Sequence, residues 1–199
     1  MAKVMYRVVG PDGADFRIRD NAGVVELSYD GGSNWLTATE LAILDGVTAT
    51  AAEINTAADT GSRVVSITDA TTYACTAANS GKTHVVPELT ADIVISLPTA
   101  AAGLEYVFIA GANAADAQDW QIDTGSDTNF YIGGVVQHDT DDAGDDTVVY
   151  HPDGDSNSKV NFLTPDGGTR VHVACDGTNW FLNAILISAT DAGVTWADQ

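Results

Sequence analysis

Most of this 199-residue chain is a succession of short segments rich in β-forming residues, each closed by turn residues. From residue 62 onward, Gly, Asp or Pro separates segments that are rich in Val, Ile, Thr and aromatic residues. No segment among them has the length and period of a helix, which argues against a parallel sheet with crossover helices. The sequence therefore predicts an all-β fold, a jelly-roll-like β-sandwich over residues 62–199. The expected strands are 63–68, 83–86, 92–97, 105–110, 120–123, 131–136, 147–150, 159–163, 170–174 and 180–187.

The first 36 residues predict a small N-terminal β-hairpin region. Phe16 and Ile18, and later Val25 and Leu27, alternate with polar neighbours, which is the period of a half-buried strand. A hairpin of about thirty residues is rarely stable by itself. We therefore interpret residues 1–36 as an attachment region that packs on something else.

Residues 37–61 contain an internal repeat that predicts a short helical linker. Thr37 to Glu40 and Thr50 to Glu53 each have the Thr-x-x-Glu spacing of a capping box, in which the hydroxyl and the carboxylate each accept a hydrogen bond from a free backbone amide. Helices this short are marginal in isolation. We expect them to be ordered by packing on a neighbour in the same subunit or in another one.

The charge of the chain excludes two classes of partner. Eight Lys and Arg residues stand against 28 Asp and Glu residues, a formal net charge of −20. Because nucleic acid and anionic lipid are bound by Lys or Arg side chains that replace counterions, we expect neither nucleic acid nor a membrane as a partner. Half of the basic residues lie in the first 19 positions, which indicates either different partners for the two ends or a hairpin that is basic by chance.

Cysteine usage and the N-terminal sequence indicate synthesis in the cytoplasm. The first residues lack the basic start and long apolar core of a signal peptide, and no apolar run of about 18 residues is present. Cys75 and Cys175 lie far apart in apolar surroundings, so we expect two buried thiols in a reducing compartment.

No pattern in the sequence predicts catalysis, so we expect no enzyme, no cofactor and no dedicated metal site. No Gly-x-Ser-x-Gly motif is present, and the histidines lack the spacing of metal ligands. The acidic loop 139–146 could still collect a hard cation. The loop that begins at Asp153 has alternating oxygen ligands, but Ser158 and Thr164 replace the glycine and glutamate of a calcium loop.

The repeat also carries a resemblance to a known group of proteins. Thr37-Ala38-Thr39-Glu40-Leu41-Ala42-Ile43-Leu44-Asp45-Gly46 and Thr48-Ala49-Thr50-Ala51-Ala52-Glu53-Ile54-Asn55 resemble a repeat of tailed-bacteriophage structural proteins, found in tail fibres and in capsid decoration proteins. Residues 81–98 are similar to the opening hairpin of decoration-protein domains, and residues 102–109 and 175–181 are similar to their later strands. The first copy has Ala where Asn is common, and the second lacks Leu-Asp-Gly.

This resemblance, which spans residues 36–199, implies a capsid decoration (cement) protein. Such a protein would assemble in the host cytoplasm as a homotrimer, bind the outside of the head and bridge subunits of the major capsid protein. The buried interface would stabilise the shell against the pressure of the internal DNA. The candidate contacts with the capsid or with another subunit are Lys3, Arg7, Arg17, Arg19, Trp35, Leu41, Leu44 and Trp196, the last in a tail beyond the final expected strand.

The alternative is a short tail fibre or adhesin, because the repeat is shared with fibres. Its N-terminal part would attach to the virion, and its β domain would bind a host surface glycan. The chain has no long repetitive shaft, which counts against this alternative. A calcium-dependent carbohydrate-binding module is a third class, against which the absence of a signal peptide and of an enzyme domain counts.

Overall fold

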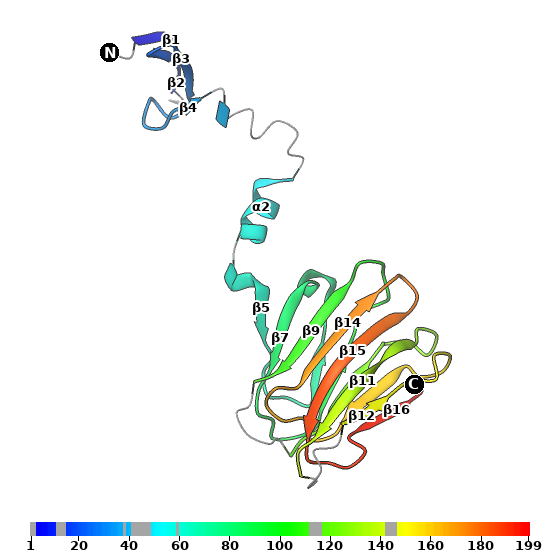
Figure 1. The fold of residues 1–199 in the computed structure, drawn as a ribbon. Helices are drawn as coiled ribbons and strands as arrows, with labels where there is room; N and C mark the ends of the chain where they lie inside the picture. Colours follow the sequence, from blue (N-terminus) through cyan, green and yellow to red (C-terminus); the bar gives the residue numbers. More distant parts are fainter. Residues whose placement is uncertain are drawn as a thin grey trace. The chain divides into compact units, whose positions relative to one another are not determined.

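The chain is almost entirely β-structure and divides into two compact units. A computed structural model describes residues 3–10, 15–37, 39–40, 49–58, 60–111, 117–141 and 147–199. Over these ranges it contains one α-helix, two short 3-10 helices and strands in three sheets. The units are Met1–Asn55 and Thr56–Gln199 (Figure 1). The predicted all-β class is confirmed.

The first unit contains an antiparallel sheet with the strand order β1-β2-β3-β4. Its strands are β1 (Lys3–Val9), β2 (Asp15–Asn21), β3 (Val24–Ser28) and β4 (Leu36–Thr37). Strands β2 and β3 are joined by Ala22 and Gly23, both with positive φ angles of 55° and 89°. Two such residues form the turn whose twist matches that of the flanking strands.

Both predicted capping boxes are formed. The amide and hydroxyl of Thr37 donate to Glu40 Oε2 at 2.7 and 2.8 Å, and the Glu40 amide donates to Thr37 Oγ1 at 3.1 Å. Thr50 and Glu53 repeat this arrangement at the start of helix α2 (Ala51–Ala58). These hydrogen bonds lower the pKa of both glutamates. The remainder of the first copy, residues 41–48, lies outside the described residues.

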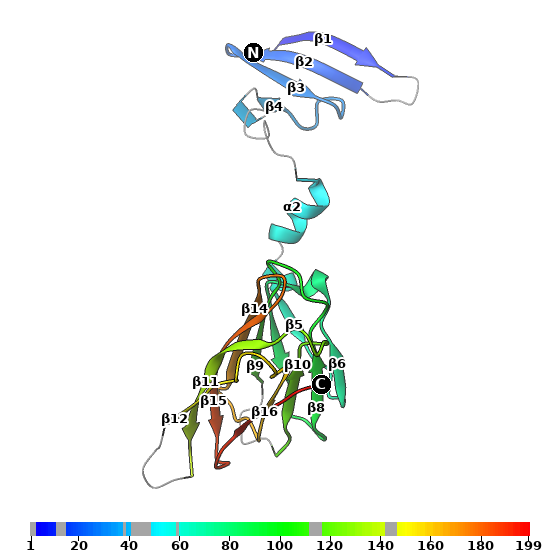
Figure 2. The ribbon, with the colours of Figure 1, turned by 90° about the vertical axis from the view of Figure 1, so that its right-hand side faces the viewer.

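The second unit is the predicted β-sandwich (Figure 2). Its five-stranded sheet has the order β16-β13-β10-β8-β6, and its seven-stranded sheet has the order β12-β11-β15-β14-β9-β7-β5. The elements are η1 (Thr60–Arg63), β5 (Val64–Ser66), β6 (Thr72–Ala74), η2 (Ala77–Asn79), β7 (Lys82–Val86), β8 (Ile93–Ser96), β9 (Glu105–Ala110), β10 (Trp120–Asp123), β11 (Tyr131–Asp139), β12 (Thr147–Tyr150), β13 (Lys159–Phe162), β14 (Arg170–Cys175), β15 (Trp180–Ser188) and β16 (Val194–Ala197).

The connections of the sandwich differ from those of an antiparallel jelly roll. From β5 to β10 the chain changes sheet at every step, so each strand from β7 to β10 pairs in parallel with the strand two places earlier. The crossover between parallel neighbours is therefore a strand of the opposite sheet and not a helix. The hairpin β14–β15 lies between β9 and β11, and β15 pairs in parallel with β11.

Alternating side chains of the two sheets meet in one hydrophobic core. Strand β15 is buried at every second position from Trp180 to Ser188. The largest fully buried apolar side chains are Trp120, Trp180, Tyr106, Tyr131, Phe108 and Phe162. Because a buried side chain of this size contributes roughly 1.5–3 kcal/mol, this core gives the sandwich its own source of stability.

Two strands of the second unit were not predicted, and one of them corrects the position of a candidate contact. Strand β6 has three residues and β16 has four. Trp196 was expected in a tail beyond the last strand, and this is wrong, because it lies in β16 at the edge of the five-stranded sheet. Its ring packs against Tyr131 at a centroid distance of 6.1 Å, so its own subunit accounts for its partial burial.

A histidine side chain is buried in the core. His84 is fully buried in β7, with the rings of Tyr73, Tyr106 and Phe108 at 5.3–5.8 Å. Neither ring nitrogen makes a hydrogen bond within the described part of the chain. Burial lowers the pKa of His84, because a charged imidazolium would lose its hydration there.

This arrangement predicts a loss of stability in mild acid that depends on one side chain. The unfolded chain takes up a proton at His84 near the ordinary pKa of 6.5, whereas the folded chain does not. The stabilisation from His84 is therefore present above pH 6.5 and is lost as the pH falls toward the lowered pKa of the folded state. In urea unfolding, we expect His84→Leu to gain stability relative to the wild type as the pH is lowered. His138→Leu, at an exposed histidine, is the control, and a pH-independent difference for His84→Leu would contradict the prediction.

Candidate functional site

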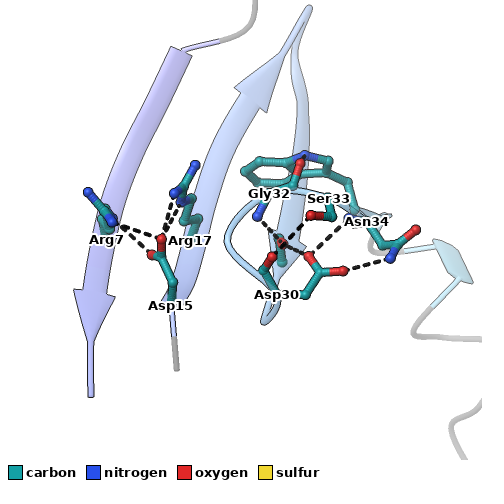
Figure 3. A network of polar contacts seen from close by, with 9 residues as sticks. Arg7, Asp15, Arg17, Asp30, Gly32, Ser33 and Asn34 are labelled. Carbon is teal, nitrogen blue, oxygen red and sulfur yellow. Dashed lines mark hydrogen bonds and ion pairs between the residues drawn. The ribbon is translucent and has the colours of Figure 1, made fainter. Parts of the chain in front are cut away.

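The basic candidate contacts lie on the N-terminal sheet, and two of them share one carboxylate. Arg7 Nη2 and Arg17 Nη2 donate to Asp15 Oδ2 at 2.9 and 2.5 Å (Figure 3). The register places the strand positions of these arginines directly opposite each other in β1 and β2. Hydrogen bonds from Arg17 and then from Arg7 hold the pKa of Asp15 well below its usual range. The carboxylate thus joins two cations that would otherwise repel each other.

A third arginine is paired on the same face. Arg19 Nε donates to Glu26 Oε2 at 2.5 Å, and Asn21 Nδ2 donates to the other carboxylate oxygen at 3.2 Å. Hydrogen bonding from Arg19 lowers the pKa of Glu26, whose residue is only 8% exposed. The Arg19 guanidinium lies 3.9 Å from the centre of the Trp35 ring, a cation–π contact. Trp35, a candidate subunit contact, therefore packs within its own sheet.

The loop between β3 and β4 is closed by its own hydrogen bonds. The Ser28 hydroxyl donates to Asp30 Oδ1 at 2.7 Å, and the Asn34 amide and side chain donate to the two Asp30 oxygens at 2.9 and 2.6 Å (Figure 3). These bonds, that from the Asn34 amide first, lower the pKa of Asp30 to about 2. Gly32 has φ +93°, and a Cβ there would lie 3.2 Å from the Trp35 ring, so this position requires glycine.

The opposite face of the same sheet is apolar and exposed. Cross-strand pairs place six apolar side chains together on it, and we call these residues the apolar face: Tyr6, Val8, Phe16, Ile18, Val25 and Leu27. Ile18 and Leu27 are half-buried, and the others range from 39% exposure at Phe16 to 56% at Tyr6. Glu26 and Ser28 are buried on the polar face, so this sheet reverses the usual distribution of polar and apolar side chains.

The fourth basic candidate lies on the apolar side. Lys3 is exposed and lies directly opposite Asp20, at the end of the apolar face. It has no ion pair within the described residues. The structure thus brings Arg7, Arg17, Arg19 and Trp35 together on the polar face and separates Lys3 from them. Trp196 belongs to the second unit, and Leu41 and Leu44 lie outside the described residues.

The sequence interpretation missed the two acids that pair these arginines and the exposure of the apolar face. Glu26 was not singled out, because the spacing along the chain does not show that it faces Arg19 across strands. Asp15 was also missed, although its spacing of two from Arg17 on one strand was a signal that they share a face. The alternation of Phe16, Ile18, Val25 and Leu27 did contain the signal for a one-sided apolar sheet.

The acidic loops of the second unit have ordinary structural roles where they are described. Asp153 Oδ1 accepts hydrogen bonds from the amides of Asp155, Ser156 and Asn157, which closes a turn. Carboxylate oxygens of Asp139, Asp141 and Asp191 lie within 4.8 Å of one another. Three carboxylates, one buried and two exposed, do not by themselves define a metal site. Residues 142–146 of the predicted acidic loop lie outside the described residues.

A shallow hollow lies on the outward face of the seven-stranded sheet. It has a volume of about 310 Å³ and is lined by Arg170, His172, Asn183 and Ile185. His172 Nε2 lies 2.7 Å from Glu105 Oε1, whereas the Arg170 guanidinium has no partner in the described part of the chain. This hollow offers a cation, an amide and an apolar side chain to solvent.

The two cysteines are free and buried, as expected. Burial raises the pKa of the Cys75 thiol to about 12, so it is not a nucleophile at neutral pH. In the described residues, no helix has the length and apolar character that crossing a bilayer requires. No family model and no curated protein matches the sequence.

Because Arg19 is paired on the polar face and Lys3 is not, we expect different effects when each of these two cations of the sheet is neutralised. Arg19→Met removes the charge that pairs Glu26 and the contact with Trp35, leaving a poorly hydrated carboxylate without its main partner. We expect faster amide hydrogen exchange in β3 and in the following loop, measured by mass spectrometry. Lys3→Met is the matched control and should leave exchange there unchanged. Equal exchange in both variants would show that the Arg19 contacts do not hold the loop.

Proposed function

We propose that this protein is a bacteriophage capsid decoration protein that binds the outside of the head, bridges major capsid protein subunits and stabilises the shell. The observation that carries the proposal is the contrast between its two units. The sandwich has a complete core, whereas the N-terminal sheet has an exposed apolar face. In a chain with this division, the N-terminal unit is suited to binding another protein, and the sandwich is suited to a position exposed to solvent.

The N-terminal sheet supports the assembly role because a single layer cannot bury its own apolar face. Stable domains pack at least two layers of secondary structure around a core. The loop between β3 and β4 covers the polar face. Within the described residues, no strand or helix packs as a layer on the apolar face. The sheet therefore gains stability by binding another protein, as a cement protein must.

The distribution of charge supports an outward position for the sandwich. Residues 1–55 contain four basic and eight acidic residues, and residues 56–199 contain four basic and twenty acidic residues. Like charge on neighbouring sandwiches disfavours close packing between them and keeps the displayed surface hydrated. The N-terminal unit is the less acidic one and is the better candidate for contact with the capsid.

Among the basic residues, we propose Lys3 and Arg7 as contacts with the major capsid protein. All three arginines are held by acids of their own sheet, but the Arg7 side chain is 56% exposed, whereas those of Arg17 and Arg19 are 27% and 24% exposed. The proposal includes assembly in the host cytoplasm, self-association as a homotrimer and a place on the capsid exterior. It requires no catalytic step and no cofactor.

The copy number of the protein in the virion tests this function directly. Symmetric placement on a capsid lattice predicts on the order of hundreds of copies, and placement at the tail predicts about a dozen or two. We expect the higher number, measured by quantitative gel staining of purified virions against the major capsid protein. A count near a dozen would contradict the decoration proposal.

The hollow on the seven-stranded sheet favours a second candidate, an adhesin that binds a host surface glycan. Sugar sites combine hydrogen-bonding side chains with apolar surface, and this hollow contains Arg170, Asn183 and Ile185. Phe181, 45% exposed on the same strand and on the same side as Asn183 and Ile185, extends the apolar surface. The unpaired guanidinium favours an acidic sugar.

Glycan binding separates the two candidates. On arrays of neutral and acidic glycans, we expect no retention of the decoration protein. An adhesin would be retained, and Arg170→Ala would weaken its retention at least about 10-fold through loss of the charged hydrogen bond. Lys159→Ala, which removes a cation from the other sheet, is the control. Retention that depends on Arg170 would replace the decoration proposal by the adhesin.

A further inference from the structure

The apolar face of the N-terminal sheet is a docking surface whose dimensions define what can cover it. Strands β1 to β3 have five to seven residues each. At spacings of about 4.8 Å between strands and about 3.3 Å per residue, they form a face of roughly 15 by 20 Å. A second sheet, packed about 10 Å away, is the layer that matches it.

The area of the face is sufficient for a stable contact only when the partner is of similar size. Two faces of these dimensions, with exposed Tyr, Val and Phe side chains, bury on the order of 1,000 Å² in total, near the lower limit for specific protein interfaces. A smaller partner would leave part of the face in water. The same face of a second copy meets this requirement because it has the same size.

Charge also favours a second copy. Each chain has a net charge of −20, so most contacts between two copies bring like charges together. The apolar face is the exception, because its flanking charges, Lys3 and Asp20, lie opposite each other and cancel. In a two-fold symmetric contact the same patch is used on both subunits, so this balanced pair of charges at the edge of the face adds no net repulsion.

We propose that the apolar face packs against the same face of a second copy of this chain. In a dimer, the two N-terminal sheets form a two-layered sandwich. In a trimer, the three apolar faces point toward a common axis and form one core. In both arrangements Phe16 and Ile18, at the centre of the face, become core residues, and the polar faces with their arginines remain outside. The inference identifies the self-association surface and does not depend on where the protein is located in a virion.

The mass of the full chain in solution tests the proposal. Wild-type protein at micromolar concentration should have two or three times the monomer mass of 20.7 kDa by light scattering or sedimentation equilibrium. Phe16→Asp places a carboxylate in the new core and should weaken association at least about 100-fold. Phe181→Asp changes an equally exposed phenylalanine on the sandwich and should leave the mass unchanged. A monomeric wild type, or dissociation by Phe181→Asp alone, would overturn the proposal.

Cross-linking tests the same contact without disturbing the fold. Val25→Cys on the apolar face and Val149→Cys on the sandwich are similarly exposed, and the two native cysteines are buried. A bis-maleimide with a reach of about 20 Å, the length of the face, should link Val25→Cys copies. At the same low protein concentration it should leave Val149→Cys copies unlinked. Equal linking of both variants would contradict a specific contact.

The results also separate this inference from the decoration proposal. A protein that is monomeric in solution but present in hundreds of copies per head would refute self-association, including the homotrimer, and support the rest of the decoration proposal, with the capsid protein on the apolar face. A protein that self-associates through the face but is present in about a dozen copies would support the inference and refute decoration.

Discussion

The side chains of a strand point alternately to the two sides of its sheet, so every apolar face needs a cover. In the sandwich, the two sheets cover each other, and aromatic side chains such as Trp120 and Trp180 fill the space between them. The N-terminal sheet has the same alternation but only one layer. Its polar side chains pair with one another and are covered by a loop, which leaves the apolar side chains in water. The same alternation of side chains therefore gives a covered apolar face in the sandwich and an exposed one in the N-terminal sheet.

The ion pairs of the N-terminal sheet also determine which face is left uncovered. A shift of one residue in strand pairing would exchange the two faces of a strand. With Arg17 and Asp15 on one side and Glu26 opposite Arg19, such a shift would move charges among apolar side chains and separate each pair. Exposed ion pairs contribute little to stability by themselves. Here their main contribution is to specify the register.

The sequence predicted structure well where it is determined by residues that are close together along the chain. Both Thr-x-x-Glu capping boxes are formed, because all their atoms come from four consecutive residues. The alternation of apolar residues and the turn residues also predicted ten strands and the sandwich. They did not predict the parallel pairing, because neither pattern shows which strands become neighbours. The same limit applies to the site. Arg17 and Arg19 were expected to contact a partner because basic residues cluster at the N-terminus, and the pairing of Arg19 with Glu26 is identified only by the pairing of strands.

The position of the β14–β15 hairpin has a consequence for synthesis of the chain. This hairpin comes from the last thirty residues but lies in the interior of the seven-stranded sheet, between β9 and β11. The earlier strands can pair in order as they leave the ribosome, since β7 to β10 each pair with a strand made shortly before. Until the hairpin inserts, however, β9 and β11 present open edges to other chains, and such edges are where β-proteins aggregate. The seven-stranded sheet can therefore close only after its C-terminal residues have been made, and slow translation prolongs the exposure of these two edges.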